Sequence, residues 1–369
     1  MTQKKHHMYY PLIAVSTFII LFGLIMLTSA SGVIGIDTFN DPYYFLKHQI
    51  IFGLLPGIFF ALGAVYAPAS FFNKIVILLY IVTIMLLILV LAPDIGFLHG
   101  GAKRWILIGQ LSIQPSEIAK LTSVLFLARW FSSKTKDHTD MYARYIPPLL
   151  YMGMNVLLIA LQPDIGTLSV IIAITLSMVL IAGIPKRHFM LLLLLGVIFF
   201  AVIIKVAPYR LARITAYLNP EADTLGTSYQ INQSLVAIGS GGLLGRGLGQ
   251  SKQKYQYLPE VMGDSIFAVI AEELGFVLTS VVIIMYSYFI ILIFRIAQKI
   301  PDHFLKYTSC GIATWFAVQT ILNIGSMVRM VPLTGLPLPF VSYGGSSMIV
   351  SLIALGIVIN ASQYIKKGA

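Results

Sequence analysis

The sequence predicts an all-α, polytopic membrane protein that forms a single domain over residues 1–369. Hydrophobic residues make up 58% of the chain and charged residues only 11%, a composition that a soluble protein of this length does not have. In addition, windows of about 20 apolar residues recur along the whole chain, and a helix of that length crosses the hydrocarbon core of a bilayer. The two observations together predict a bundle of transmembrane helices.

Ten windows are expected to span the membrane, at about 11–31, 46–67, 75–93, 114–131, 146–161, 165–184, 189–207, 265–294, 308–328 and 345–364. An even number of spans places both termini on one side. Short loops on that side carry Lys74, Lys186 and Arg187. Because such cations resist translocation, we expect both termini to be cytoplasmic. The only cysteine, Cys310, excludes a disulfide framework and a thiolate metal site.

The predicted outer face carries more cations than this topology rule favours. They are Lys103, Arg104, Lys120, Arg210, Arg213, Arg246, Lys252, Lys254 and Arg329. Cations that remain outside against the bias indicate a site for an anionic ligand. The alternative is that long loops translocate largely regardless of their charge.

Two similar segments begin helices at the outer face. Gln114-Pro115-Ser116-Glu117 opens the fourth window, and Gln162-Pro163-Asp164 opens the sixth. Proline and an acidic residue in a first turn are typical of a helix N-terminus, so capping explains both segments. Capping does not explain Lys120, which shares a helix face with Glu117 and can pair with it. Asp164 has a second interpretation, in which it orients one of the outer cations.

The stretch 208–263 is the longest predicted loop. Its amphipathic piece from Gly226 to Ile238 contains Gln233 and Ser234, and six glycines follow between 239 and 249. We expect a short re-entrant or interfacial helix here. The glycines permit close approach of the backbone to a ligand, but the run lacks the Gly-Lys-Ser/Thr of a phosphate loop.

Asp264 lies where this loop meets the eighth window. A charged group at the centre of a membrane helix costs roughly 2.5–3.5 kcal/mol, so an ionisable residue at the boundary suggests a function. Before the tenth window, the segment 334–347 contains two prolines and paired glycines. Irregular backbone at this depth must lie within protein or beside a wet cavity. Ser346 either caps the last helix or contacts a ligand, and Ser342 lies in the same segment.

Six motifs in a fixed order carry a family resemblance. They are Lys103-Arg-Trp105, Gln114-Pro-Ser-Glu117, Gln162-Pro-Asp164, the run 234–242, Leu258-Pro-Glu260 with Asp264, and the run 339–347. With these motifs the chain resembles the shape, elongation, division and sporulation (SEDS) family, the FtsW/RodA/SpoVE proteins of bacterial cell-wall synthesis. The segments ending at Glu117 and Lys254 are more similar to division-type FtsW than to elongation-type RodA.

The resemblance implies a ten-helix peptidoglycan glycosyltransferase that polymerises lipid II at the outer leaflet of the cytoplasmic membrane. It also implies a class B penicillin-binding transpeptidase and other divisome membrane proteins as partners, and no nucleic acid. The chain departs from the family at two places. Met262-Gly263 stands where the family commonly has His-Thr, so no orienting role transfers to them. Thr334 stands where many FtsW proteins carry a lysine, which weakens the division assignment.

In this interpretation Asp264 matches the family's catalytic aspartate and acts as general base on the acceptor hydroxyl. The cations expected to stabilise the leaving pyrophosphate are Arg104, Lys120, Arg210, Arg213, Lys252 and Lys254. Further substrate contacts are expected from Gln233, Ser234, Ser342 and Ser346. Positioning roles are expected for Gln114, Ser116, Glu117, Gln162, Asp164 and Glu260. The sequence contains no metal-ligand cluster, so Mg²⁺ or Mn²⁺ would bind through carboxylates and substrate phosphates.

Two other function classes compete with the enzyme. A flippase for lipid-linked precursors also has polar residues in its spans and helices broken at proline. A path across the membrane needs polar groups at the midplane, for which Asn155, Gln319 and Asn323 are the main candidates. The crowding of ionisable residues in the outer half argues against this class. A scaffold that only recruits a partner would leave the outer charges without a purpose.

Overall fold

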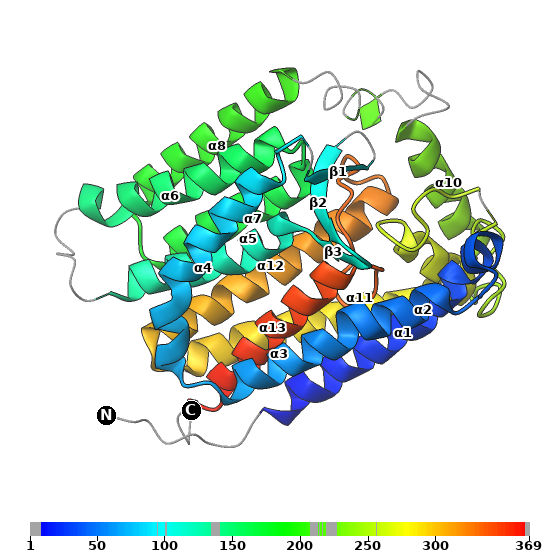
Figure 1. The fold of residues 1–369 in the computed structure, drawn as a ribbon, viewed down its shortest axis with the longest axis horizontal. Helices are drawn as coiled ribbons and strands as arrows, with labels where there is room; N and C mark the ends of the chain where they lie inside the picture. Colours follow the sequence, from blue (N-terminus) through cyan, green and yellow to red (C-terminus); the bar gives the residue numbers. More distant parts are fainter. Residues whose placement is uncertain are drawn as a thin grey trace.

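The computed structural model describes residues 9–93, 95–99, 102–133, 141–206, 213, 215, 217–218, 227–255 and 257–365. The chain is mostly helical, as predicted, and its long helices lie alongside one another in a bundle (Figure 1). In chain order the helices are α1 (Tyr10–Phe39), α2 (Tyr44–Gln49), the π-helix η1 (Ile50–Leu54), α3 (Leu55–Tyr66), α4 (Ala69–Leu89), α5 (Pro115–Ser132), α6 (Met141–Leu161), α7 (Ile165–Ile181), α8 (Lys186–Val206), α10 (Thr227–Ser240), α11 (Ile266–Lys299), α12 (His303–Met327) and α13 (Gly345–Ser362).

Every one of the ten predicted windows contains a helix, with α2, η1 and α3 running on as one helix over Tyr44–Tyr66. Seven helices in the described part of the chain are long and apolar enough to cross a membrane. Of the others, α7 has 17 residues, and α5 and α12 carry buried polar side chains such as Lys120 and Gln319. The polar helices α5 and α12 pack against each other. The number of helices that span the membrane stays a prediction.

Helix starts follow the local sequence. Pro115 occupies the first turn of α5, where its missing N–H removes no helical hydrogen bond. Asp164 caps α7 by accepting from the backbone N–H of Thr167 at 3.1 Å. Asp302 caps α12 in the same way, accepting from Leu305 at 2.9 Å.

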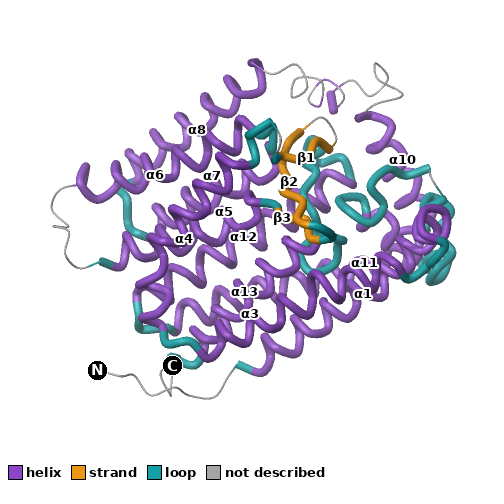
Figure 2. The backbone as a smooth tube through the Cα atoms, viewed as in Figure 1, coloured by secondary structure: helices purple, strands orange, loops and turns teal. Residues whose placement is uncertain are grey.

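A small antiparallel sheet was not predicted. It has the order β1 (Gly96–His99), β2 (Ala102–Ile108) and β3 (Leu111–Ile113), and it holds Lys103 and Arg104 on its middle strand. Ile108 pairs with Leu111 across a two-residue turn in which Gly109 has φ 62°, a conformation that hairpin turns require and glycine adopts freely. Figure 2 shows the three strands together, and β2 packs against α5 and β3 against α13.

Helix α11 is broken at Gly275, whose backbone is φ 72° and ψ −178°. The glycine-rich run after α10 supplies the hydrogen bonds that the break removes. Gly242 and Leu243 accept through their carbonyl oxygens from the N–H groups of Phe276 and Val277, at 2.9 and 3.1 Å. On the other side, the N–H groups of Arg246 and Gly247 donate to Glu272 and Glu273, at 3.1 and 3.0 Å. The glycines therefore permit close approach to a helix backbone.

The two ends of the described chain meet. The N–H of Tyr9 donates to the hydroxyl of Ser362 at 3.3 Å, so α1 begins where α13 ends. An even number of spans places both ends on the same side of the membrane, and this contact agrees with that topology. The predicted cytoplasmic location of both termini stays a prediction.

Candidate active site around Asp264

Two helices contact Asp264, which lies two residues before the start of α11 and is only 8% exposed. From α10, Nε2 of Gln230 donates to Oδ1 of Asp264 at 3.0 Å. From α12, Nδ2 of Asn323 donates to the backbone oxygen of Asp264 at 2.9 Å. One contact fixes the carboxylate and the other fixes the main chain, so the side chain is held in a defined place.

The surroundings of Asp264 favour its protonated form. Burial raises the pKa of this carboxyl group from 3.8 to about 7, and the negative charge of Glu260 contributes in the same direction. The positive charge of Arg213 and the hydrogen bond from Gln230 lower the pKa of Asp264 and partly offset these effects. A carboxylate with a pKa near neutrality is suited to accept a proton and release it again.

Arg213 and Gly335 lie on the side of Oδ2. The guanidinium group of Arg213 donates through Nη1 to the backbone oxygen of Leu333 at 3.0 Å. A Cβ atom placed on Gly335 would lie 3.9 Å from Oδ2 of Asp264 and 4.0 Å from Nη1 of Arg213. Because Gly335 has no side chain, there is room for a methyl-sized group beside both the carboxylate and the cation.

The irregular segment after α12 holds the chain that leads to Asp264. The hydroxyl of Ser342 donates to the carbonyl of Gly263 at 2.6 Å and accepts from the N–H of Leu338 at 2.8 Å. Next to it, the N–H of Tyr343 donates to the carbonyl of Met262 at 2.8 Å. Ser342 therefore positions backbone in this structure, and its predicted contact with a substrate stays a prediction.

Lys120 lies inside the bundle and is 0% exposed. Its ammonium group bonds to Glu117 and to Oε1 of Gln319, both at 2.7 Å, and lies 4.9 Å from the ring centroid of Trp315. Gln319 donates onward to the carbonyl of Pro337 at 2.8 Å. The predicted pair of Glu117 and Lys120 is thus present and is connected to the segment beside Asp264. Whether Lys120 contacts phosphate stays a prediction.

The other predicted helix start forms a second polar cluster. Ser116 donates to Asp164 at 3.1 Å and accepts from the side chain of Gln114 at the same distance. Arg104 donates to the backbone oxygens of Gln162 and Pro163, so β2 is joined to the turn before α7.

The hydroxyl groups of Ser346 and Ser234 also form hydrogen bonds within the protein. Ser346 accepts from the N–H of Gln114 at 3.1 Å and donates to the carbonyl of Ser112 at 2.6 Å, which joins β3 to α13. Ser234 donates to the carbonyl of Gln230 at 2.8 Å. Gln233 lies half-buried on α10, and Arg210 lies outside the described residues.

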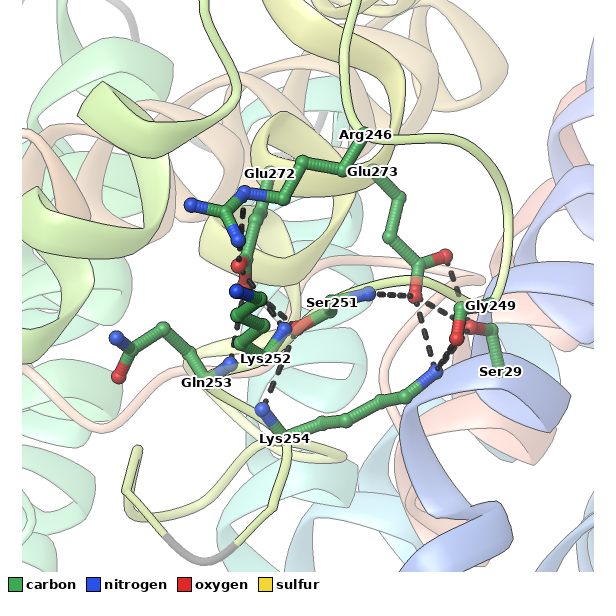
Figure 3. Close-up of polar contacts among 9 residues, drawn as sticks. All are labelled: Ser29, Arg246, Gly249, Ser251, Lys252, Gln253, Lys254, Glu272 and Glu273. Carbon is green, nitrogen blue, oxygen red and sulfur yellow. Dashed lines mark hydrogen bonds and ion pairs between the residues drawn. The ribbon is translucent and has the colours of Figure 1, made fainter.

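Glu272 and Glu273 organise the loop that precedes Asp264 (Figure 3). Glu272 accepts from the hydroxyl of Ser251 at 2.6 Å and from the backbone N–H groups of Lys252 and Gln253 at 3.0 and 3.3 Å. The ammonium group of Lys254 lies 3.2 Å from Oε1 of Glu273. Glu272 thus binds the backbone of Lys252, whose side chain is exposed, whereas Glu273 binds the side chain of Lys254.

The same acidic pair ties α1 and the glycine-rich run to this loop. Ser29 of α1 donates to both carboxylate oxygens of Glu273, at 2.7 and 2.8 Å. Arg246 lies 3.6 Å from Glu272. We call this cluster the acidic clasp, and it consists of Glu272, Glu273, Ser29, Ser251, Lys254 and Arg246. Glu272, Glu273 and Ser29 are not among the site residues that the sequence predicts.

No group of three or more histidine, cysteine, aspartate or glutamate side chains in the described part of the chain is placed to hold a metal ion. The carboxylate of Glu260, whose charge acts on Asp264, is an oxygen donor of the kind that Mg²⁺ accepts together with phosphate oxygens.

Comparison with known proteins relates the whole chain to one family. A family model for FtsW, RodA and SpoVE, described as "Cell cycle protein", matches residues 10–367. The stage V sporulation protein E of Bacillus subtilis (strain 168) is 40% identical over 366 residues, which cover 99% of each chain. The probable peptidoglycan glycosyltransferase FtsW of Legionella pneumophila is 37% identical over 92% of this chain and 87% of its own.

Solved structures agree with this relationship. One chain, from a study of the structural coordination of polymerization and crosslinking by a peptidoglycan synthase complex, aligns with a TM-score of 0.76 and 27% identity over 96% of this chain and 97% of its own. The rod shape determining protein RodA of Thermus thermophilus aligns with a TM-score of 0.71 and 28% identity over 96% of both chains. From its sequence and its fold, this multi-pass membrane protein belongs to the FtsW/RodA/SpoVE family.

Proposed function

We propose that this protein is a peptidoglycan glycosyltransferase that polymerises lipid II at the outer leaflet of the bacterial cytoplasmic membrane. The observation that carries the proposal is the buried carboxylate of Asp264, whose pKa is raised to about 7 and whose Oδ2 faces the space next to Gly335 and Arg213. Relatives named as probable peptidoglycan glycosyltransferases support the same reaction class.

In the proposed reaction Asp264 is the general base. The oxygen of the acceptor sugar hydroxyl attacks the anomeric carbon of the donor from the face opposite the leaving group, and its proton passes to Asp264. The bond between the anomeric carbon and the pyrophosphate oxygen breaks, and undecaprenyl pyrophosphate leaves with the electron pair. The configuration at the anomeric carbon is inverted. A positioned base typically contributes a factor of about 10²–10⁴ to such a rate.

The leaving pyrophosphate requires positive charge. Arg213 is the first candidate, because its guanidinium group is the described cation that acts on the Asp264 carboxylate. Arg104 and Lys252 are also proposed as ligands, and Arg210 belongs to the same segment of the chain as Arg213. Lys120 and Lys254 belong to the proposed set as well, although both ammonium groups bond to buried carboxylates in this structure. Gln233, Ser234, Ser342 and Ser346 complete the proposed substrate contacts.

A divalent cation, Mg²⁺ or Mn²⁺, is proposed as an accessory to this chemistry, held by substrate phosphates together with Glu260. When bound, it would neutralise charge on the pyrophosphate. The proposed partners are a class B penicillin-binding transpeptidase and other membrane proteins of the division machinery. The study of a peptidoglycan synthase complex supports the transpeptidase partnership. The motifs described above favour cell division over elongation.

The test is lipid II polymerisation by the purified protein together with its cognate transpeptidase. Asp264→Asn keeps the size of the side chain and removes the base, so we expect a rate reduced by about 10²–10⁴. The control is Asp41→Asn, which removes an exposed carboxylate that pairs with Lys47 at 2.7 Å. We expect this control to polymerise at the native rate, and thermal unfolding verifies that both variants are folded.

Each other outcome excludes part of the proposal. Normal polymerisation by Asp264→Asn would retain the enzyme class and reject Asp264 as the base. If the native complex makes no strands but lipid II crosses liposome membranes in its presence, the flippase is correct instead. Two of the three polar residues proposed for a crossing path bond to the backbone instead. Gln319 donates to the carbonyl of Pro337 and Asn323 to that of Asp264, which supports the enzyme.

A further inference from the structure

Gln230 binds only one of the two carboxylate oxygens of Asp264. Its Nε2 donates to Oδ1 of Asp264 at 3.0 Å and to the hydroxyl of Ser265 at 2.9 Å. An ionised carboxylate only accepts hydrogen bonds, so the NH₂ end of the amide must face it. Both N–H groups of that amide are therefore used, and the orientation of Gln230 is determined by its neighbours.

The turn of α10 that carries Gln230 is anchored. Ser234 donates to the carbonyl of Gln230 at 2.8 Å and contacts the sulfur of Met327 at 3.4 Å. Next to Gln230, Ile231 is 2% exposed and packs in a cluster with Phe267 of α11. A side chain on a rigid, packed turn can hold a partner in one geometry. Gln230 therefore has the support that a positioning residue needs.

The other oxygen, Oδ2, faces Gly335 and Arg213. A methyl group on Gly335 would lie 3.9 Å from Oδ2 and 4.0 Å from Nη1 of Arg213, so it would fill this space without overlapping either atom. Gly335 also has φ 70°, a conformation that other residues adopt only with strain. Both properties favour glycine at this position.

From this arrangement we infer that the two oxygens of Asp264 have separate tasks. Gln230 is a positioning residue that fixes Oδ1, and Oδ2 takes the proton of the acceptor hydroxyl, which lies over Gly335 between Oδ2 and Arg213. This inference rests on the proposed function. No covalent step is added to the reaction: the proton that leaves the acceptor oxygen is bound by Oδ2.

The inference predicts how Gln230 affects the titration of Asp264. A hydrogen bond to the ionised form stabilises that form, so removal of the donor must raise the pKa of Asp264. In the described part of the chain, the charged groups that act on Asp264 are Glu260 in its own loop and Arg213 on the opposite side. Neither is changed by a substitution at Gln230, so the shift can be attributed to the lost hydrogen bond.

The experiment combines pH–rate profiles of polymerisation with a readout that does not need activity. A hydrophobic carbodiimide reacts with protonated carboxyl groups, and peptide mass spectrometry measures its attachment at Asp264 as a function of pH. For Gln230→Leu we expect the labelling midpoint and the acidic limb of the rate profile to move to higher pH. At pH 6 the rate should fall by roughly tenfold, which corresponds to one pKa unit, and it should recover at pH 8.5.

The matched control is Asn232→Leu, which removes an exposed amide from the same helix. We expect its midpoint and rate profile to match those of the native protein. If Gln230→Leu does not fold, Gln230→Asn replaces it, because the shorter amide cannot reach Oδ1 from the same backbone. A midpoint equal to the native one in the folded variant would overturn the role of Gln230.

Gly335→Ala tests the second half of the inference. We expect slower polymerisation even at pH 8.5, because the added methyl group occupies the space of the acceptor and leaves Oδ1 bound. Native kinetics for a folded Gly335→Ala variant would place the acceptor elsewhere. If the native protein makes no strands at all, the proposed function fails, whereas the labelling experiment still tests the bond between Gln230 and Asp264.

Discussion

Lys254 places its ammonium group 3.2 Å from Oε1 of Glu273, and neither side chain is more than 5% exposed. The same ammonium group donates to the carbonyl of Gly249 at 2.7 Å. Three hydrogen-bonded partners, with Ser29 the third, surround this cation. In this structure the positive charge of Lys254 balances a buried carboxylate inside the protein.

Loss of one partner from this pair should destabilise the fold. Lys254→Met leaves Glu273 buried with its charge unbalanced, and breaking a buried pair in this way typically costs about 3–5 kcal/mol. Thermal unfolding in detergent should show a large decrease in the midpoint. Lys254→Met combined with Glu273→Gln should recover part of that loss. Unchanged stability of Lys254→Met with weakened lipid II binding would indicate a phosphate ligand instead.

Because the glycine-rich run packs against the break in α11, we expect two glycines of this region to differ in their tolerance of alanine. A Cβ atom on Gly245 would overlap the carbonyl of Glu273, and Gly245 has φ 80°. Gly239, on α10, has no atom within 4 Å of the corresponding position. We therefore expect Gly245→Ala to lower the unfolding temperature and Gly239→Ala to leave it unchanged or raised, since alanine favours helix. Equal effects would contradict the packing of this run against α11.

The rate of polymerisation should depend on pH near neutrality. With a folded pKa of about 7, Asp264 is protonated below that pH and cannot act as a base, so the rate should rise through pH 7 and then level off. The negative charge of Glu260 raises this pKa. Glu260→Gln should therefore move the rise to lower pH. A profile that Glu260→Gln leaves in place would exclude this coupling.

Substitutions at two buried asparagines should distinguish a loss of stability from a loss of polymerisation activity. Asn323 donates to the backbone oxygens of Asp264 and Leu336, whereas Asn155 donates to Ser123 at 3.1 Å, in α5. Replacement of either asparagine by leucine leaves buried acceptors unsatisfied, at a typical cost of about 1–3 kcal/mol for each group. We expect both variants to lose stability and only Asn323→Leu to lose polymerisation beyond the loss of folded protein. Equal activities per folded molecule would exclude the positioning role of Asn323.

The helical bundle is predictable from the sequence because the length and hydropathy of each apolar window determine it locally. The pair of Glu117 and Lys120 is predictable too, since residues i and i+3 lie on one helix face whatever the tertiary fold. The sheet was not predicted, although part of its signal is present in the sequence. The apolar runs 105–108 and 111–113, rich in β-branched and aromatic residues, flank the two residues Gly109-Gln110.

The residues that contact Asp264 could not be predicted from the sequence. Gln230 and Asn323 are 34 and 59 positions away from Asp264, and no local periodicity relates them to it. From the sequence, the backbone of the glycine-rich run is expected to approach a ligand. In the structure this backbone approaches the backbone of α11 at Gly275 instead, a tertiary contact that no spacing in the sequence encodes.

The acidic clasp has a consequence for the biosynthesis of the protein. Among the described residues, the side chains and backbone groups that bond to the carboxylates of Glu272 and Glu273 lie earlier in the chain than α11: Ser29, Arg246 and the loop from Ser251 to Lys254. Chains emerge from the ribosome N-terminal end first. The partners of both carboxylates are therefore already synthesised when α11 enters the membrane. The order of translation thus allows Glu272 and Glu273 to bond to these partners as α11 inserts into the bilayer.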